Sequence, residues 1–268
     1  MLVEYYSPSH HSEPTAISHR YSNPLVERLN MFVTLGDEER EAVIAMTCSR
    51  RTFKANETLV REGCRPDRIC LIVSGVAYRY RYLANGRRQI FGYLLPGDLC
   101  DTQFVILNEC DHNVGLLCDT EVATISLPAL MSAMVKYPKI ERALLMMSLV
   151  DAAMLREWLL NVGQRDAFQK LAHFFCELSA RFHALGIHDA TTGYTIPLTQ
   201  IELADTMGLT VVHVNRILQR FRREGLVNWS RRHFDIIDYP QLEHLAGFDA
   251  SYLRLRTCRA EPKLMAYG

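Results

Sequence analysis

The chain has 268 residues, which is enough for one large domain or two of ordinary size. Hydrophobic residues make up 49% and charged residues 22%, as in globular proteins, and no stretch of about 18 uncharged apolar residues predicts a membrane span. The 30 basic and 30 acidic residues cancel, so the net charge gives no indication for or against a nucleic-acid partner.

The first 23 residues are rich in Pro, Ser and His and lack the basic-then-apolar order of a signal peptide. We therefore expect a flexible arm over residues 1–23 and a cytoplasmic protein. The eight cysteines are too dispersed along the chain for a small disulfide scaffold, which also favours a reducing compartment.

Residues 24–135 begin with helical spacing up to residue 47 and then change to short strand-like segments. Tyr78, Tyr80 and Tyr82 alternate with Arg79 and Arg81, which is the period of a half-buried strand. The Asn85-Gly86 pair between two such segments is a strong hairpin signal. The sequence therefore predicts a small antiparallel barrel or roll over about residues 50–127.

Residues 136–163 return to helical spacing. The stretch 143–150, ALLMMSLV, carries no charge on any face, so this helix must be covered on two sides. We expect the roll to cover one side and a second copy of the helix to cover the other. The proposed seam has the 3-4-3-4-3 spacing of a coiled coil: Leu145, Ser148, Ala152, Leu155, Leu159 and Val162. The alternative is a core helix within a single chain.

Residues 164–240 have the capping and turn residues of a winged helix-turn-helix. An amphipathic helix ending at Gly186 is followed by a capping box, Thr199-Gln200-Ile201-Glu202, that starts a second helix. Gly208 permits the sharp turn, and Thr210 caps a third helix. The sequence VNWSRRHFDIID then predicts a two-stranded wing. We expect a C-terminal tail over residues 241–268.

The basic residues gather at this end of the chain. Six arginines and one acid lie between Leu209 and Arg232, whereas Gln89 to Val135 contains neither Arg nor Lys. On the third helix Arg216 can hydrogen-bond to guanine, Asn215 can pair with a base edge, and the valines can contact a thymine methyl group. The full predicted DNA-binding set is Thr199, Thr210, Val211, Val212, His213, Asn215, Arg216, Gln219, Arg220, Arg223, Arg231 and Arg232. The alternative is a solvated basic helix in an unrelated fold.

This order of parts resembles the Crp/Fnr family of bacterial transcription regulators over about residues 25–240. The resemblance is strongest in LTQIELADTMGLTVVHVNRILQRFRREGLV and in GRRQIFGYLLPGDL. It implies an α+β protein with an N-terminal β-roll sensor of the cyclic-nucleotide-binding (jelly-roll) type, a long dimerisation helix and a winged helix-turn-helix. It also implies a homodimer on a palindromic double-stranded DNA site, with RNA polymerase as a further partner of an activator and no membrane partner.

The sequence departs from the family in its sensor. Relatives that bind cyclic AMP carry a Gly-Glu pair and then an Arg-Ser pair, but residues 99–122 here contain no Arg or Lys. A buried phosphate without a cation is unfavourable by several kcal/mol, so we expect no control by cyclic AMP. In the reading helix, Val212 stands where many relatives have Glu, which predicts a preference for thymine there rather than cytosine.

Other sensing chemistries remain open. The spacing is Fnr-like, yet the first cysteine is Cys48, so no N-terminal iron–sulfur cluster is expected. The alternatives are a redox or metal role for roll cysteines, with Cys110 beside His112 the first candidate, haem, or a regulator without a ligand. The roll cysteines are Cys64, Cys70, Cys100, Cys110 and Cys118.

We expect no enzymatic activity, no catalytic residues and no resident metal. A cupin-type enzyme needs several histidines on its roll, and between residues 50 and 127 the sequence has only His112. No Gly-x-Ser-x-Gly, P-loop or His-Glu-x-x-His motif occurs. The alternative from another class is a protein-interaction module with weak DNA binding.

Overall fold

The computed structural model describes residues 23–100, 107, 109–186, 194–195, 198–230 and 233–255. The predicted arm therefore lies outside the described residues except for Asn23. Asn23 is buried, and its side chain caps the first helix by accepting from the backbone N–H groups of Leu25 and Val26.

An antiparallel β-roll follows two short helices, α1 (Pro24–Asn30) and α2 (Asp37–Met46). Its described strands are β1 (Arg50–Phe53), β2 (Thr58–Val60), β3 (Arg68–Ser74), β4 (Ala77–Tyr82), β5 (Arg88–Leu94), β6 (Asn113–Leu116) and β7 (Thr120–Ser126). They form two sheets, β1-β7-β3 and β2-β6-β4-β5. The predicted hairpin joins β4 to β5, and Gly86 adopts a positive φ of 78° in its turn.

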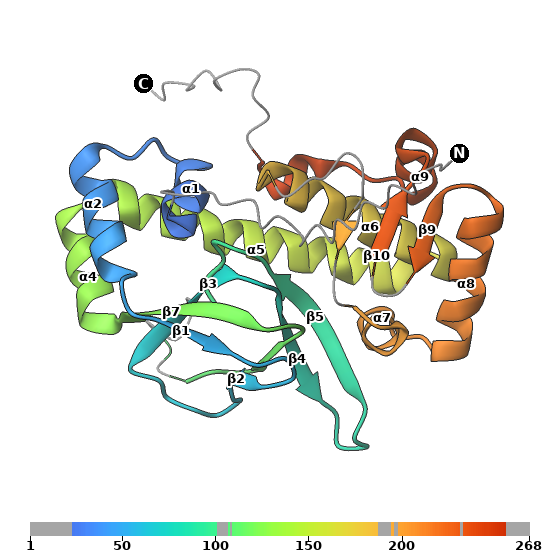
Figure 1. Ribbon diagram of the computed structural model, residues 1–268, viewed down its shortest axis with the longest axis horizontal. Coiled ribbons are helices and arrows are strands. Elements are labelled where there is room, and N and C mark those ends of the chain that lie inside the picture. The colour runs from blue at the N-terminus through green and yellow to red at the C-terminus, as the bar shows by residue number, and fades with distance from the viewer. Residues whose placement is uncertain are drawn as a thin grey trace, which may run out of the picture.

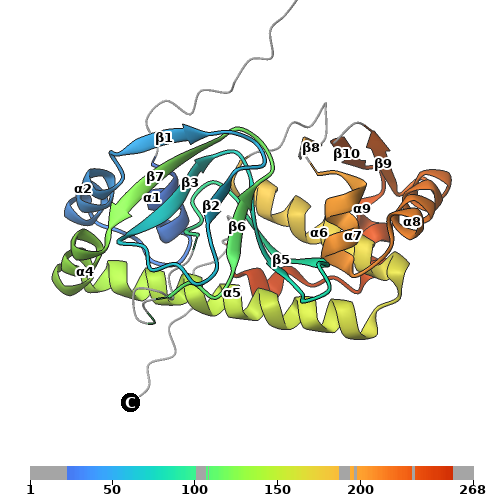
Figure 2. The ribbon, with the colours of Figure 1, turned by 90° about the horizontal axis from the view of Figure 1, so that it is seen from below.

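Two helices close the roll and lead out of it. Helix α4 (Leu127–Lys136) packs beside β7 and α2 (Figure 1), and helix α5 (Pro138–Gln164) runs from the roll to the C-terminal helices along the lower edge of Figure 2. Pro138 occupies the first turn of α5, where its missing N–H group leaves no intrahelical hydrogen bond unmade.

The C-terminal part lies at the other end of α5 (Figure 2). It contains α6 (Ala167–Ala184), β8 (Tyr194–Thr195), α7 (Gln200–Met207), α8 (Val211–Arg223), β9 (Val227–Ser230), β10 (His233–Ile236), α9 (Tyr239–Ala246) and the short 3-10 helix η1 (Ala250–Leu253). The predicted wing is present as β9 and β10. A third strand, β8, pairs with β10 and was not predicted from the sequence.

The prediction of a C-terminal tail from residue 241 is wrong for residues 241–255, which are folded. Helix α9 packs against α6, and Leu242 and Leu253 are 0% and 1% exposed. These apolar side chains stabilise the C-terminal part by about 2 kcal/mol each when buried, so the chain stays folded well past residue 240.

Helix α5 contributes to both hydrophobic cores. Ile140 and Met147 pack in a core with α1, α2, α4 and the roll. Met154 and Trp158 belong to a second core shared by β4, β5 and the C-terminal helices. Because one continuous helix is buried in both cores, a change in its position affects the roll and the winged domain together.

Candidate nucleic-acid interface

Helices α7 and α8 and the turn between them form the predicted helix-turn-helix. The hydroxyl of Thr199 and the carboxylate of Glu202 make the expected capping box at the start of α7. Gly208 adopts the left-handed conformation, with a φ of 65°, and ends α7. Thr210 then caps α8 by accepting from the backbone N–H of His213 at 3.2 Å.

Helix α8 has one apolar face and one polar face. Val214 and Phe221 are 0% exposed, and Ile217 and Leu218 lie beside them in the same core. Phe221 stacks on Phe168 of α6 with ring centroids 4.3 Å apart. This packing fixes the rotation of α8 about its own axis and therefore determines which side chains face solvent.

The exposed face of α8 carries most of the predicted DNA-binding residues. Val211 and Val212 are 41% and 63% exposed, which is unusual for valine and leaves both methyl surfaces available to a ligand. His213, Asn215, Arg216, Gln219 and Arg223 are exposed as well. The structure thus brings these side chains to one surface, and their contact with DNA stays a prediction.

Besides Thr210, two members of the predicted set already have partners within the chain. The Nε of Arg220 lies 2.7 Å from Oε1 of Glu224, and its guanidinium lies over the Phe168 ring at 3.8 Å. Thr199 uses its hydroxyl and backbone N–H groups in the capping box. A contact of either residue with DNA would compete with these internal interactions.

The wing places its apolar residues on the core of the C-terminal part. Phe234 is 0% exposed and lies 5.0 Å from Phe175 of α6, measured between ring centroids. Strands β9 and β10 pair up to Ser230 and His233. The predicted phosphate-binding residues Arg231 and Arg232 fall between these two positions and lie outside the described residues.

Helix α5 exposes the apolar stripe predicted to be a dimer seam. Leu145, Leu155, Leu159 and Val162 are 59%, 44%, 74% and 41% exposed, while Ser148 and Ala152 between them are half-buried. Leu149 and Leu160 widen the stripe and are 60% and 53% exposed. Exposed leucines in such a continuous row on one helix are typical of a surface that another molecule covers.

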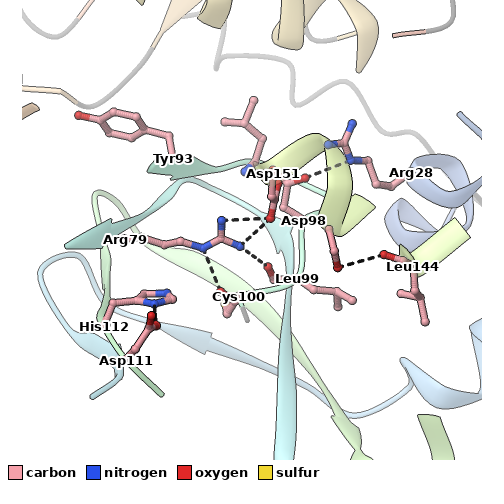
Figure 3. A network of polar contacts seen from close by, with 12 residues as sticks. Arg28, Arg79, Tyr93, Asp98, Leu99, Cys100, Asp111, His112, Leu144 and Asp151 are labelled. Carbon is pink, nitrogen blue, oxygen red and sulfur yellow. Dashed lines mark hydrogen bonds and ion pairs between the residues drawn. The ribbon is translucent and has the colours of Figure 1, made fainter. Parts of the chain in front are cut away.

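The interior of the roll holds an arginine that connects it to α5 (Figure 3). Arg79 of β4 is 16% exposed and donates two hydrogen bonds of 3.1 Å to one carboxylate oxygen of Asp151 on α5. It also donates to the backbone carbonyls of Cys100 and Leu99, both at 3.1 Å. Burial lowers the pKa of Arg79, but the carboxylates of Asp151 and Asp98 together outweigh this effect and hold the pKa above its ordinary value.

A second buried ion-pair cluster joins the roll, α1 and α6. Asp98 lies 3.1 Å from Nε of Arg28 and 2.9 Å from Nη2 of Arg181. Burial disfavours the charged carboxylate, but the two arginines outweigh it and hold the pKa of Asp98 below its ordinary value. A salt-bridged aspartate therefore links the roll to the first helix of the winged domain.

Strand β5 contacts the helix-turn-helix directly, which sequence reasoning did not predict. Arg88 lies 2.8 Å from Asp205 of α7, and it donates to the hydroxyl of Tyr78 at 3.0 Å. The hydroxyl groups of Tyr93 and Thr206 are 2.6 Å apart. No local sequence signal could reveal the contacts of Arg88 with Asp205 and of Tyr93 with Thr206, because these partners are more than a hundred residues apart.

The cysteine predicted to be the first redox or metal candidate is buried in the roll. Cys110 is 1% exposed, and the nearby His112 places Nδ1 2.6 Å from Oδ1 of Asp111. Among the residues that the structure describes, no group of three or more His, Cys, Asp or Glu side chains is arranged to hold a metal ion.

Comparisons with known proteins match both halves of the chain. Residues 169–245 match the Crp-like helix-turn-helix domain and residues 50–137 the cyclic nucleotide-binding domain. The transcriptional activator protein FnrL of Cereibacter sphaeroides is 28% identical over 217 residues, which cover 80% of this chain and 87% of that protein. The transcriptional regulatory protein btr of Bordetella pertussis is 30% identical over 164 residues, or 61% and 67% of the two chains.

The fold is shared with solved structures. FixK2 from Bradyrhizobium japonicum superposes with a TM-score of 0.66 at 21% sequence identity, over 74% of this chain and 96% of that one. A β-roll, a long connecting helix and a winged helix-turn-helix together define a DNA-binding transcription regulator rather than an enzyme. The chain belongs to the Crp/Fnr family. In the described part of the chain, none of the helices is long and apolar enough to cross a membrane.

Proposed function

We propose that two copies of this chain bind a palindromic double-stranded DNA site and insert the exposed face of α8 into the major groove. The orientation of α8 supports this proposal most strongly. Its apolar side is packed on α6, and its opposite side presents Val211, Val212, Asn215 and Arg216 to solvent. A major groove about 12 Å wide admits one α-helix with such a face.

Some residues of α8 would read the DNA sequence, and others would only position the protein on the DNA. Arg216 would give two hydrogen bonds to a guanine, and the methyl groups of Val212 would contact a thymine. Arg223, at the last turn of α8, would meet phosphates, which position the protein without reading the sequence. The backbone N–H groups beginning at Val211 would add a phosphate contact at the helix N-terminus.

The homodimer would form through the stripe on α5. Its leucines lie on the side of α5 that faces away from both hydrophobic cores. Covering them with the same stripe of a second copy gives a two-fold axis, and a two-fold protein matches a two-fold DNA site. Such a regulator would act in the cytoplasm and would contact RNA polymerase if it is an activator.

Cyclic nucleotides would not control this protein. The roll interior already contains Arg79, and its guanidinium is bound to Asp151 and to two backbone carbonyls. A nucleotide phosphate there would have to displace the Asp151 carboxylate from its cation, because residues 99–122 supply no Arg or Lys. Isothermal titration calorimetry with cyclic AMP and cyclic GMP tests this, and micromolar binding of either would contradict it.

The assignment of α8 is tested with two arginine variants. Arg216→Ala should weaken binding to the selected site by about 1–3 kcal/mol and change random-sequence binding much less. Arg223→Ala is the matched control: it should weaken binding to both DNAs by the same factor and reduce the salt dependence. If the two variants lose affinity equally on specific and random DNA, the division into reading and positioning residues is wrong.

A further inference from the structure

Two cysteines of the roll face each other across neighbouring chain segments. Leu71 of β3 and Leu99 form an antiparallel bridge, so the residues that flank them, Cys70 and Cys100, are also directly opposite. The backbone N–H of Cys100 donates to the carbonyl of Cys70 at 2.8 Å. Residues opposite each other in an antiparallel pair have Cα atoms about 4.5–5.5 Å apart. Disulfides span Cα separations of about 4.4–6.8 Å.

The two cysteine side chains lie on paired chain segments, and only one of them is partly exposed. The thiol of Cys100 donates a hydrogen bond to the sulfur of Cys70, which lowers the pKa of Cys70 against the opposing effect of burial. Cys70 is half-buried, whereas Cys100 is 0% exposed. This arrangement gives an oxidant access to Cys70 first and leaves Cys100 beside it to react second.

Cys100 also belongs to the contact between the roll and α5. Its carbonyl accepts from Nε of Arg79, and the carbonyl of the preceding Leu99 accepts from Nη2, both at 3.1 Å (Figure 3). The same guanidinium binds Asp151, which precedes Ala152 of the predicted dimer seam. The chain segment that carries Cys100 therefore supports the side chain that connects the roll to α5.

We propose that Cys70 and Cys100 are an oxidation site, and that a reversible disulfide between them locks the contact of Arg79 with α5. The thiolate of Cys70 attacks hydrogen peroxide and the O–O bond breaks. The leaving hydroxide takes up the proton that the Cys70 thiol had released and departs as water, and Cys70 becomes a sulfenic acid. The thiol of Cys100 then attacks this sulfur, its proton leaves with the displaced oxygen as a second water, and the S–S bond forms. Both sulfur atoms are oxidised, and the two peroxide oxygens are reduced to water. A small dithiol reverses the reaction by thiol–disulfide exchange.

The consequence of the disulfide follows from the bond's position. It ties β3 to the Leu99–Cys100 segment and so restrains the carbonyl groups that hold Arg79 on Asp151. The loop that it closes has about 30 residues, for which a native-geometry disulfide gives substantial stabilisation. Because a restrained Asp151 contact leaves α5 better ordered before DNA is bound, oxidation should tighten DNA binding. This last step rests on the proposed function, whereas the disulfide itself does not.

The experiment uses the purified full-length chain, either reduced with dithiothreitol or oxidised with hydrogen peroxide. Mass spectrometry of a non-reducing digest should show a Cys70–Cys100 linked peptide in the oxidised protein. The melting temperature should rise by about 5 °C on oxidation and fall again after dithiothreitol. Cys70→Ser should abolish both effects, and Cys118→Ser, which changes another half-buried roll cysteine, should leave both unchanged.

The formation of the disulfide and its effect on DNA binding are tested separately. A linked peptide joining Cys64 to Cys110, whose backbones also pair, in place of Cys70 to Cys100 would overturn the proposal. So would a Cys70–Cys100 bond that does not raise the melting temperature. The oxidised wild type should bind its selected DNA about threefold more tightly than the reduced form, and equal affinity would overturn the regulatory effect. If neither form binds DNA while the disulfide forms and stabilises the protein, the proposed function fails and the oxidation site stands.

Discussion

Leu159 gives the sharpest test of the dimer seam, because it is the most exposed leucine of the stripe on α5. It is 74% exposed in the single chain, and complete burial of a leucine side chain is worth about 2 kcal/mol. Leu159→Ala should therefore remove on the order of 1 kcal/mol per chain once partial coverage is allowed for. Two chains share the interface, so the dimer should lose about 2 kcal/mol, a roughly 30-fold increase of its dissociation constant.

Sedimentation equilibrium over a wide concentration range measures this dissociation constant directly. Leu83→Ala is the matched control, since Leu83 is 58% exposed at the tip of the β4–β5 hairpin, away from α5. It should leave the dimer unchanged. A wild-type monomer, or equal dissociation constants for the wild type and Leu159→Ala, would refute the assignment of the seam.

Three further predictions concern the winged domain and its attachment. Thr210→Ala removes the cap of α8 and should lower the free energy of unfolding by about 1 kcal/mol in a denaturant titration, with Thr210→Ser nearly neutral; equal loss in both variants would contradict the capping role. Burial lowers the pKa of His173 to about 4, so the folded protein binds fewer protons there than the unfolded one. Its contribution to stability is complete above pH 6.5 and is lost as the pH falls towards 4, by about 3 kcal/mol, and His173→Phe should lack this loss in unfolding measured at stepped pH. Arg88→Ala breaks the contact with Asp205 and should reduce the melting temperature by a few degrees, whereas Arg87→Ala, at a neighbouring exposed position, should not.

Local signals predicted the secondary structure around the candidate interface. The capping box of α7 depends on Thr199 and Glu202, which are three residues apart, and the β4–β5 turn depends on the adjacent Asn85 and Gly86. Such features involve neighbours in the chain, so the sequence pattern contains all the information that they need. The apolar spacing of α8 likewise predicted its buried face, because helix periodicity alone decides which residues share a side.

Long-range pairing accounts for what the sequence did not predict. Strand β8 has two residues and is ordered by pairing with β10, which no periodicity can indicate. The contact of Arg79 with Asp151 joins positions 72 residues apart. It depends on how the roll packs on α5. The predicted end of the folded chain at residue 240 was wrong for the same reason, since α9 is stabilised by packing on α6.

In the proposed function a two-fold pair of α8 helices reads DNA. Selection of binding sites from a random-sequence DNA pool by the purified protein tests it most directly. We predict enrichment of a palindrome with half-sites centred about one helical turn, 10–10.5 base pairs, apart, and loss of one preferred guanine per half-site with Arg216→Ala. Enriched sequences without two-fold symmetry, or the same preference in the wild type and Arg216→Ala, would contradict it.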